Sequence, residues 1–286
     1  MNKKFKSGLI LEGGAMRGMF TSGVLDVFLE NGIEFDGAIG VSAGATFGCN
    51  LKSRQIGRAI RYNKRFAHDW RYCSLRSLVF TGDMYGARFC YDTLPNKLDP
   101  FDRQAYQENP MEFYVGATDV RTGKTVYHRC ADGGEKDMAW MRASASMPLA
   151  SRPVEIDGFS LLDGGIVDPT PYLYMEKLGY GRNVVILTQP AAYRKQKSAL
   201  TPLTILALHR YPALQEAMRL RPQRYNAHIA YIARKEQEGH ALVIRPPEPL
   251  NIRRTEKDPS ELERAYRIGR REAGRRIEEI LRFLEM

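Results

Sequence analysis

The chain has 286 residues, of which 43% are hydrophobic and 27% charged, and its formal net charge is +10. This length and composition suit one large α/β domain, or a domain with a helical appendage, and they exclude a repeat or low-complexity architecture. The basic balance is compatible with nucleic acid, anionic lipid headgroups or acidic substrates, and composition alone does not choose among them.

The cysteines and the apolar runs indicate in which cellular compartment the protein is found. Cys49, Cys73, Cys90 and Cys130 form no C-x-x-C pair and have no histidine at zinc-ligand spacing, so we expect reduced thiols and no metal site. The apolar run 9–11 after the basic N-terminus is too short for a signal peptide, and no run approaches 18 apolar residues. We therefore expect a cytoplasmic protein that is at most peripheral to the inner face of the membrane.

The N-terminal residues predict two successive strand–helix units. The run 8–11 predicts a buried strand, Gly13–Gly18 a glycine-rich loop, and the apolar spacing of 19–31 a helix. The run 35–41 predicts a second strand, which ends in a G-x-S-x-G pattern over 40–44. This order of elements implies a parallel sheet.

The serine of the G-x-S-x-G pattern is Ser42. A serine on a tight strand-to-helix turn adopts a strained backbone conformation that exposes its hydroxyl in a cleft. Small residues such as Gly40 and Gly44 let the strand and the helix pass closely, and the helix N-terminus favours negative charge at the serine. A lone G-x-S-x-G can equally be an ordinary glycine-rich turn, so this pattern does not decide the function.

The middle of the chain is less regular. Residues 52–103 mix basic and aromatic side chains, and we expect a half-buried cap helix and loop, although such a mixture can also bind nucleic acid or a lipid interface. Strands are expected over 112–119 and 124–130, followed by a helix over 136–146. A short strand from Phe159 then enters a tight turn that begins at residue 163.

The C-terminal part predicts further strands and helices. We expect a buried strand over 183–188, a loop over 192–202 and a short strand over 242–244. Between the loop and the last strand, the pattern predicts two helices within 212–238, separated at Pro222.

The final element is expected to be one long helix. Pro259 near its start and a capping box formed by Ser260 and Glu263 are its start signals. Its apolar face is expected to consist of Leu262, Tyr266, Gly269, Ala273, Ile277, Leu281 and Leu284.

Serine attack on a carbonyl also needs a base and donors for the oxyanion. The loop Gly13–Gly18 can supply backbone N–H groups. Asp163 stands at a strand end, and Gly164 and Gly165 let other backbone approach it. A carboxylate is a weak base and needs a dry, preorganised site, and a simple turn is the alternative. No histidine falls at such a strand end; the histidines are His68, His128, His209, His228 and His240.

Together, these three stretches resemble the patatin-like phospholipase family. That family carries a glycine-rich oxyanion loop ending in Arg-Gly, a G-x-S-x-G elbow and an Asp-Gly-Gly or Asp-Gly-Ala motif. The resemblance covers about residues 6–173 and includes the small-residue helix end 143–148. The chain departs from the family at Ala15, where glycine is frequent and where a positive φ would cost roughly 1 kcal/mol or more.

The resemblance implies a three-layer α/β/α fold with a mainly parallel sheet, in which 6–173 is the catalytic domain and 174–286 completes the sheet and adds helices. It implies a serine esterase of the phospholipase A type that uses no metal and no cofactor. Ser42 would attack a lipid ester, and Asp163 would take the proton of the Ser42 hydroxyl. The expected partners are a lipid or other acyl ester as substrate and an anionic membrane as a peripheral contact. The oxyanion would be held by the N–H groups of Gly13, Gly14, Ala15, Met16, Arg17 and Gly18.

Three alternatives remain open at this point, and one of them is a protein that keeps the fold but has no activity because the motifs serve only the scaffold. Gly13–Gly18 follows a strand and opens a helix, and Asp36 lies about 20 residues further on, as a dinucleotide-binding fingerprint requires. Against this alternative, Ala15 takes a glycine position, and Asp36 begins a strand where the fingerprint expects a residue at the strand end. The third alternative, a basic nucleic-acid-binding α/β protein, rests on charge alone, and we expect no nucleic-acid partner.

Overall fold

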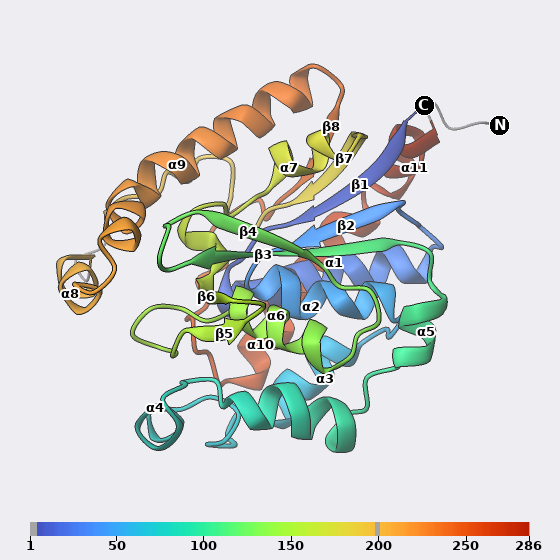
Figure 1. Ribbon diagram of the computed structural model, residues 1–286. Coiled ribbons are helices and arrows are strands. Elements are labelled where there is room, and N and C mark those ends of the chain that lie inside the picture. The colour runs from blue at the N-terminus through green and yellow to red at the C-terminus, as the bar shows by residue number, and fades with distance from the viewer. Residues whose placement is uncertain (1–4, 198–200, 286) are drawn as a thin grey trace.

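The structure is a computed structural model that describes residues 5–197 and 201–285 (Figure 1). Its middle layer is an eight-stranded sheet with the order β5-β6-β3-β2-β1-β7-β8, and β4 pairs with β3 off this path. The parallel part comprises β1 (Lys6–Leu11), β2 (Gly37–Gly40), β3 (Glu112–Asp119), β7 (Tyr180–Ile186) and β8 (Ala241–Ile244). The antiparallel part comprises β4 (Thr125–Arg129), β5 (Val154–Ile156) and β6 (Phe159–Asp163).

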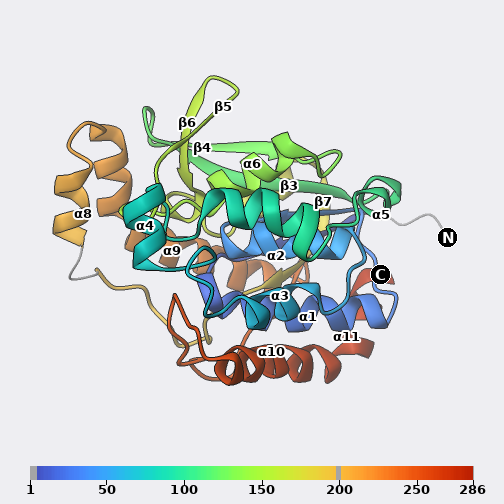
Figure 2. The same cartoon turned by 90° about the horizontal axis from the view of Figure 1, so that it is seen from below.

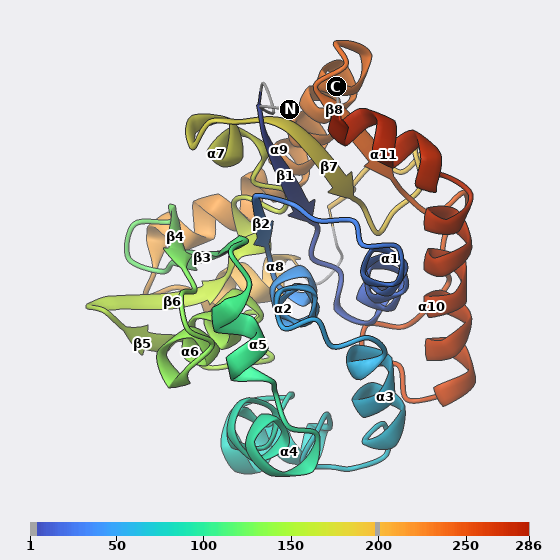
Figure 3. The same cartoon turned by 90° about the vertical axis from the view of Figure 1, so that its right-hand side faces the viewer.

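Both faces of the parallel strands are covered, as their apolar sequences require. On β1, Leu9 and Leu11 pack into one core cluster and Ile10 into another on the opposite face. Figure 3 shows the two helical layers on either side of the sheet. One layer contains α1 (Gly18–Glu30), α2 (Ala43–Lys52), α6 (Glu135–Ser144), α10 (Pro259–Gly274) and α11 (Ile277–Glu285). The other contains α7 (Tyr172–Lys177) and α9 (Pro212–Gln237). The expected three-layer α/β/α fold with a helical C-terminal region is confirmed.

The C-terminal region is packed tightly onto the N-terminal one. A Cβ added at Gly23 of α1 would lie 2.1 Å from the carbonyl oxygen of Tyr266 on α10, and one at Gly269 would lie 2.0 Å from that of Phe20. The two helices therefore touch backbone to backbone, which only glycine permits. The buried Tyr266 hydroxyl also donates to Asp26 on α1 at 2.7 Å.

Residues 52–103 contain more structure than the expected cap helix and loop. They form α3 (Arg58–Arg65), α4 (Leu75–Thr81) and a π-helix, η2 (Phe89–Leu98), and α5 (Arg103–Glu108) follows. Of these elements, α3 and η2 pack into a second apolar cluster with residues of α1, α2 and α10, and α3 and α4 lie below the sheet in the view of Figure 1. The sequence periodicity gave little signal because the helices are short, and α4 buries only Ser77.

The expected break at Pro222 is wrong, because α9 continues through that residue. Proline lacks the N–H that a helical hydrogen bond needs, so it is unfavourable inside a helix. A helix can still continue through a proline when side chains on both sides of it are packed into the core. Leu214, Met218 and Tyr225, on either side of Pro222, are all buried. The expected loop over 192–202 also ends early, because α8 (Thr201–Ala207) begins within it; residues 198–200 lie outside the described residues.

The expected single final helix is two helices, α10 and α11. The interruption after Gly274 shifts the helical phase, so Ile280 is buried and Leu281 is exposed. The expected capping box is also wrong. Asp258 is the N-cap residue, and its carboxylate accepts the N–H of Ser260 at 2.8 Å. Glu263 instead pairs with Lys64 and Arg267.

The four cysteines are free, and three of them are buried. Within residues 5–197 and 201–285, no helix has both the length and the apolar character needed to cross a bilayer.

Candidate active site

Ser42 stands at the turn between β2 and α2 with φ 54° and ψ −121°, a strained conformation for a residue with a side chain. The turn is tight because a Cβ at Gly40 would lie 2.4 Å from the carbonyl oxygen of Gly44. A Cβ at Gly44 would lie 2.3 Å from the carbonyl oxygen of Leu11 on β1. Strand and helix therefore approach as the sequence pattern predicts, and Ser42 occupies the apex.

A second serine holds this turn in place. The N–H of Ser42 donates to the hydroxyl of Ser144 at 3.0 Å, and that hydroxyl donates to the carbonyl of Gly116 on β3 at 2.6 Å. Ser144 is fully buried at the end of α6. The sequence analysis noted the small residues around it but not this role, because the contact joins residues 102 positions apart.

Asp163 ends β6 and is only 1% exposed. Its Oδ1 accepts the N–H of Gly165 at 2.7 Å, and the Thr118 hydroxyl donates to its main-chain carbonyl at 2.9 Å. A Cβ at Gly164 would lie 2.2 Å from the carbonyl oxygen of Gly116. The two glycines therefore allow β6 to bring the carboxylate against β3, close to the point at which Ser144 is anchored.

Ser42 and Asp163 line the same cavity of about 80 Å³. Burial raises the pKa of Asp163, while the Ser42 hydroxyl, the Arg221 guanidinium and the Gly165 N–H act to lower it; burial prevails. The buried Oδ2 accepts no hydrogen bond within ordinary geometric limits, although the Ser42 hydroxyl lies near enough to affect the pKa. Oδ2 is thus left available to receive a proton.

The glycine-rich loop lies beside Ser42. A Cβ at Gly13 would lie 2.8 Å from the Cβ of Ser42, so any side chain there would collide with the serine. The N–H groups of Gly13, Gly14 and Ala15 have no hydrogen-bond acceptor among the described residues. Ala15 has φ 49°, the left-handed conformation that favours glycine. These amides are the kind of donors that an oxyanion requires.

Ser42 also lines a second, larger cavity of about 270 Å³, bounded mainly by apolar side chains from α2, η2 and α6. Ala15 and Met147 belong to both cavities. The apolar lining includes Met16, Phe47, Tyr62, Tyr91, Leu94, Met138 and Met141. Ser42 is therefore placed between a small polar space and a larger apolar one.

No histidine lines either of these two cavities. His128 pairs with Asp137 at 3.0 Å and His228 with Asp168 at 3.1 Å. These pairs engage the imidazoles of His128 and His228, and among the described residues that line the two cavities no histidine accompanies Ser42.

Comparison with known families identifies the family of this chain. The family model of patatin-like phospholipases matches residues 9–175, more than half of the chain. The chain belongs to the patatin-like phospholipase family. A second model, described as a domain of unknown function (DUF6363), matches residues 211–285.

Curated relatives carry the family domain within longer proteins. The chain is 30% identical to a lysophospholipase of Emericella nidulans over 183 residues, which is 60% of this chain and 11% of that protein. It is 29% identical to an uncharacterized NTE family protein of Mycobacterium bovis over 163 residues, 57% of this chain and 43% of that protein. The chain thus spans less than half the length of these relatives. In structure it is similar to VipD from Legionella pneumophila, with a TM-score of 0.47, 12% identity, and coverage of 96% of this chain and 67% of that one.

The patatin-like site contains charged residues that sequence reasoning missed. Arg17, Lys195, Arg221 and Arg254 line the cavity of Ser42 and Asp163. Arg17 was expected only as part of the oxyanion loop. The other three come from positions after residue 175, and no local pattern distinguishes them among the 43 Lys and Arg residues of the chain.

The dinucleotide alternative does not fit the patatin-like site. Asp36 accepts hydrogen bonds from the N–H and hydroxyl of Ser7, at 2.7 and 2.9 Å. It therefore lies at the start of β1 and β2, one strand length from the glycine-rich loop. A ribose-binding carboxylate must instead lie at the carboxyl end of the second strand.

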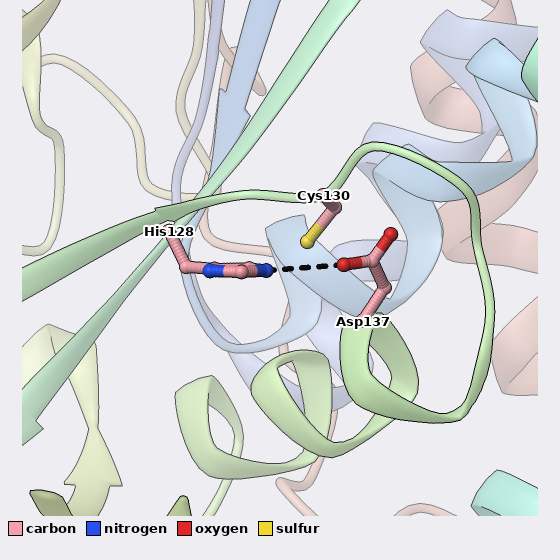
Figure 4. A group of neighbouring side chains, drawn as sticks. All are labelled: His128, Cys130 and Asp137. Atoms are coloured by element: carbon pink, nitrogen blue, oxygen red, sulfur yellow. Dashed lines mark hydrogen bonds and ion pairs between the residues drawn. The ribbon is translucent and has the colours of Figure 1, made fainter. Parts of the chain in front are cut away.

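A separate group joins His128, Cys130 and Asp137 (Figure 4), which no cysteine spacing indicated. Oδ1 of Asp137 faces His128, and its Oδ2 accepts the N–H groups of Asp132 and Gly133 at 2.9 Å each. Burial raises the pKa of the Cys130 thiol well above its usual value, which keeps it protonated and a poor metal ligand. With the carboxylate already hydrogen-bonded, we interpret the group as a structural tie between β4 and α6.

We expect Ser144→Ala to lower kcat on a soluble ester with a smaller effect on KM. The variant leaves the Ser42 N–H and the Gly116 carbonyl without a partner, which costs about 1–3 kcal/mol of stability and loosens the turn. Steady-state kinetics and thermal unfolding measure the two effects. Ser144→Thr, which keeps the hydroxyl, is expected to recover part of kcat. Wild-type kcat in a destabilised Ser144→Ala protein would contradict the positioning role.

Proposed function

We propose that this protein is a lipid acyl hydrolase of the phospholipase A type, with Ser42 as nucleophile and Asp163 as base. The observation that carries the proposal is the meeting of these two residues, 121 positions apart in the sequence, in one cavity beside unpaired loop amides. Family membership and the lysophospholipase relative support a lipid ester as the substrate class.

The proposed reaction proceeds in two halves. The Ser42 hydroxyl attacks the ester carbonyl while Oδ2 of Asp163 receives its proton, and the N–H groups of Gly13, Gly14 and Ala15 stabilise the oxyanion. The N–H groups of Arg17 and Gly18, which the sequence also suggested as donors, already donate to carbonyl groups of the loop. The tetrahedral intermediate collapses, the alcohol leaves with the proton from Asp163, and an acyl-enzyme remains. Water then attacks the acyl group while Asp163 again takes a proton. When the second intermediate collapses, Asp163 returns this proton to the Ser42 oxygen and the fatty acid is released.

The environment suits a carboxylate as base. Burial raises the pKa of Asp163 and so strengthens it, while the N-terminus of α2 favours the developing negative charge at Ser42. The apolar cavity adjoining Ser42 would take the acyl chain. This chemistry needs no metal and no cofactor.

Ser42→Ala and Asp163→Asn are each expected to lower kcat/KM on a p-nitrophenyl ester by about 10³-fold or more, because each removes a group that acts in the transition state. His228→Ala, which alters a histidine outside both cavities, serves as the control and is expected to retain activity. Fluorophosphonate labelling followed by mass spectrometry should locate the adduct on Ser42. Labelling at another serine, or full turnover by Ser42→Ala, would overturn the assignment.

The pH dependence should report on Asp163. Because the base must be ionised, kcat/KM on a neutral ester falls as the pH falls through the pKa of Asp163, which burial places above the ordinary value of 3.8. Arg221→Gln removes a positive charge that lowers this pKa, so the acid midpoint should move to higher pH. Arg219→Gln, an exposed position on the same helix that lines neither cavity, is the control. A midpoint that stays in place or falls in Arg221→Gln would contradict the coupling.

We further propose that the protein contacts an anionic membrane peripherally. On α4, Leu75, Val79 and Phe80 are 71%, 78% and 72% exposed. The guanidinium of Arg76 lies over the rings of Phe80 and Trp70, at 5.8 and 4.4 Å from their centroids. An apolar surface with an interleaved cation and a net charge of +10 suits the interface of an anionic bilayer.

The position of this surface supports lipid delivery to Ser42. Just after α4, Met84 and Tyr85 line the apolar cavity, and the N–H of Met84 donates to the carbonyl of Ala150 in the same lining at 2.7 Å. Figures 1 and 2 both show α4 and α8 at the same end of the molecule, and α8 exposes Leu203 and Leu206. A bilayer at this end would face the cavity that adjoins the nucleophile.

Val79→Glu/Phe80→Glu is expected to reduce binding to phosphatidylglycerol vesicles at least tenfold, because it places two charges where apolar side chains would enter the interface. Co-sedimentation measures binding, with phosphatidylcholine vesicles for comparison. Leu173→Glu, at a leucine on α7 that is 48% exposed, is the control. Equal vesicle binding by the double variant and the control would place the contact elsewhere.

We also propose that residues 6–173 act as the catalytic domain and that 174–286 completes the sheet and adds helices. β7 and β8 extend the sheet beyond β1, which supports the second half of this proposal. The compartment stays a prediction.

A further inference from the structure

The apolar cavity beside Ser42 contains hydroxyl groups that the binding of a plain hydrocarbon chain does not use. Among the described residues, four tyrosines line this cavity: Tyr62, Tyr72, Tyr85 and Tyr91. The Tyr72 hydroxyl donates to Oδ1 of Asn63 at 2.6 Å, and the Tyr85 hydroxyl donates to the carbonyl of Arg254 at 3.2 Å. The hydroxyls of Tyr62 and Tyr91 have no hydrogen-bond partner within residues 5–197 and 201–285.

The two unpaired phenols lie in a largely dry environment. Tyr62, on α3, is only 7% exposed, and its ring packs against that of Phe47 with the centroids 6.5 Å apart. Tyr91, on η2, is half-buried. Burial raises the pKa of both phenols, so both stay protonated and can donate as well as accept. An unpaired hydroxyl in an apolar space costs free energy that phenylalanine would avoid, so the two phenols point to an oxygen atom in the ligand.

The neighbouring cation indicates which kind of oxygen fits. Arg58 lines the same cavity, and its guanidinium lies 5.3 Å from the centre of the Tyr62 ring. That guanidinium already pairs with Asp99 at 3.3 Å and donates to Oδ1 of Asn50 at 2.9 Å. The charge beside Tyr62 is therefore already compensated and is not available for a carboxylate. Neutral phenol donors suit a neutral oxygen, such as that of a hydroxyl or keto group.

The two phenols lie at different depths relative to the reacting residues. The charge of Asp163 raises the pKa of Tyr91, which places the Tyr91 hydroxyl within electrostatic reach of the proposed base. Tyr62 lies instead beside the fully buried Arg58. An acyl chain that extends from Ser42 into this cavity therefore has a polar contact available both near the ester and further along the chain.

We propose that Tyr62 and Tyr91 recognise a neutral oxygen substituent on the acyl chain, so that the preferred ester carries a hydroxylated or keto acyl group. The proposal rests on the proposed function, in which this cavity holds the acyl chain, and it specifies the acyl group. The remaining lining, which includes Leu94, Met138 and Met141, suits methylene groups. A site that is built to hydrogen-bond a substrate hydroxyl discriminates strongly against an analogue that lacks it.

The first test compares 4-nitrophenyl decanoate with the 4-nitrophenyl esters of 3-, 7- and 10-hydroxydecanoic acid. In the wild type, kcat/KM for at least one hydroxy ester should exceed that for decanoate by about tenfold or more. Tyr62→Phe/Tyr91→Phe keeps both rings and removes only the hydroxyls. In this variant the ratio should fall to about one or below, while turnover of decanoate is retained or rises, because no unpaired hydroxyl remains.

Tyr174→Phe is the matched control. The Tyr174 hydroxyl also forms no hydrogen bond within residues 5–197 and 201–285, but this residue lines neither cavity. Its ratio should stay within about twofold of wild type. A wild type without preference for any hydroxy ester would assign the two phenols to bound water and overturn the proposal. An equal loss on all four esters in the double variant would assign the phenols to the ester itself, with the same consequence.

The second test needs no turnover and so separates the oxygen subsite from the proposed chemistry. Calorimetry with the Ser42→Ala protein should show at least one methyl hydroxydecanoate binding about tenfold or more tightly than methyl decanoate. Adding Tyr62→Phe/Tyr91→Phe should remove that difference. Binding discrimination without hydrolysis of any ester by the wild type would reject the acyl hydrolase alone. Hydrolysis by the wild type, with equal affinities for all the methyl esters, would reject the oxygen subsite alone.

Discussion

The carbonyl of Gly116 on β3 is the point on which the site depends. The buried Ser144 hydroxyl donates to it, and the same hydroxyl accepts the N–H of Ser42. Gly164 packs against the same carbonyl so closely that a Cβ would lie within 2.2 Å of it. The turn of Ser42 and the turn of Asp163 are therefore both held against one peptide group in the middle of the sheet. A shift of β3 would move both, and their relative position is protected because β3 is hydrogen-bonded to strands on both sides.

Burial and positive charge act in opposite directions on the pKa of Asp163. Burial raises the pKa of Asp163, while Arg221 and the Ser42 hydroxyl lower it. Burial prevails, so the pKa of the Asp163 carboxyl lies above its ordinary value. Arg221 lines the same cavity, but its Nε donates to the Gly165 carbonyl at 2.9 Å.

The C-terminal region takes part in both structure and site. Its helix α10 packs on α1 through glycines, and its strand β8 extends the parallel sheet beyond β7. Its helix α9 carries Arg221 into the cavity of Ser42. A region with these contacts is integrated with the patatin-like portion of the chain.

The sequence by itself determined what depends on local backbone geometry. Gly40 and Gly44 around Ser42, and Gly164 and Gly165 after Asp163, mark turns that only small residues permit, and alternating or continuous apolar runs mark the strands. The sheet, its helical layers and the turns that carry Ser42 and Asp163 were predictable for this reason. Tertiary structure alone decided which distant residues meet them. Ser144, Lys195, Arg221 and Arg254 carry no local signature, because a hydroxyl or a cation is recognised only by what folding brings beside it. The continuation of α9 through Pro222 was decided in the same way, since packing on both sides of the proline outweighs its local preference to end a helix.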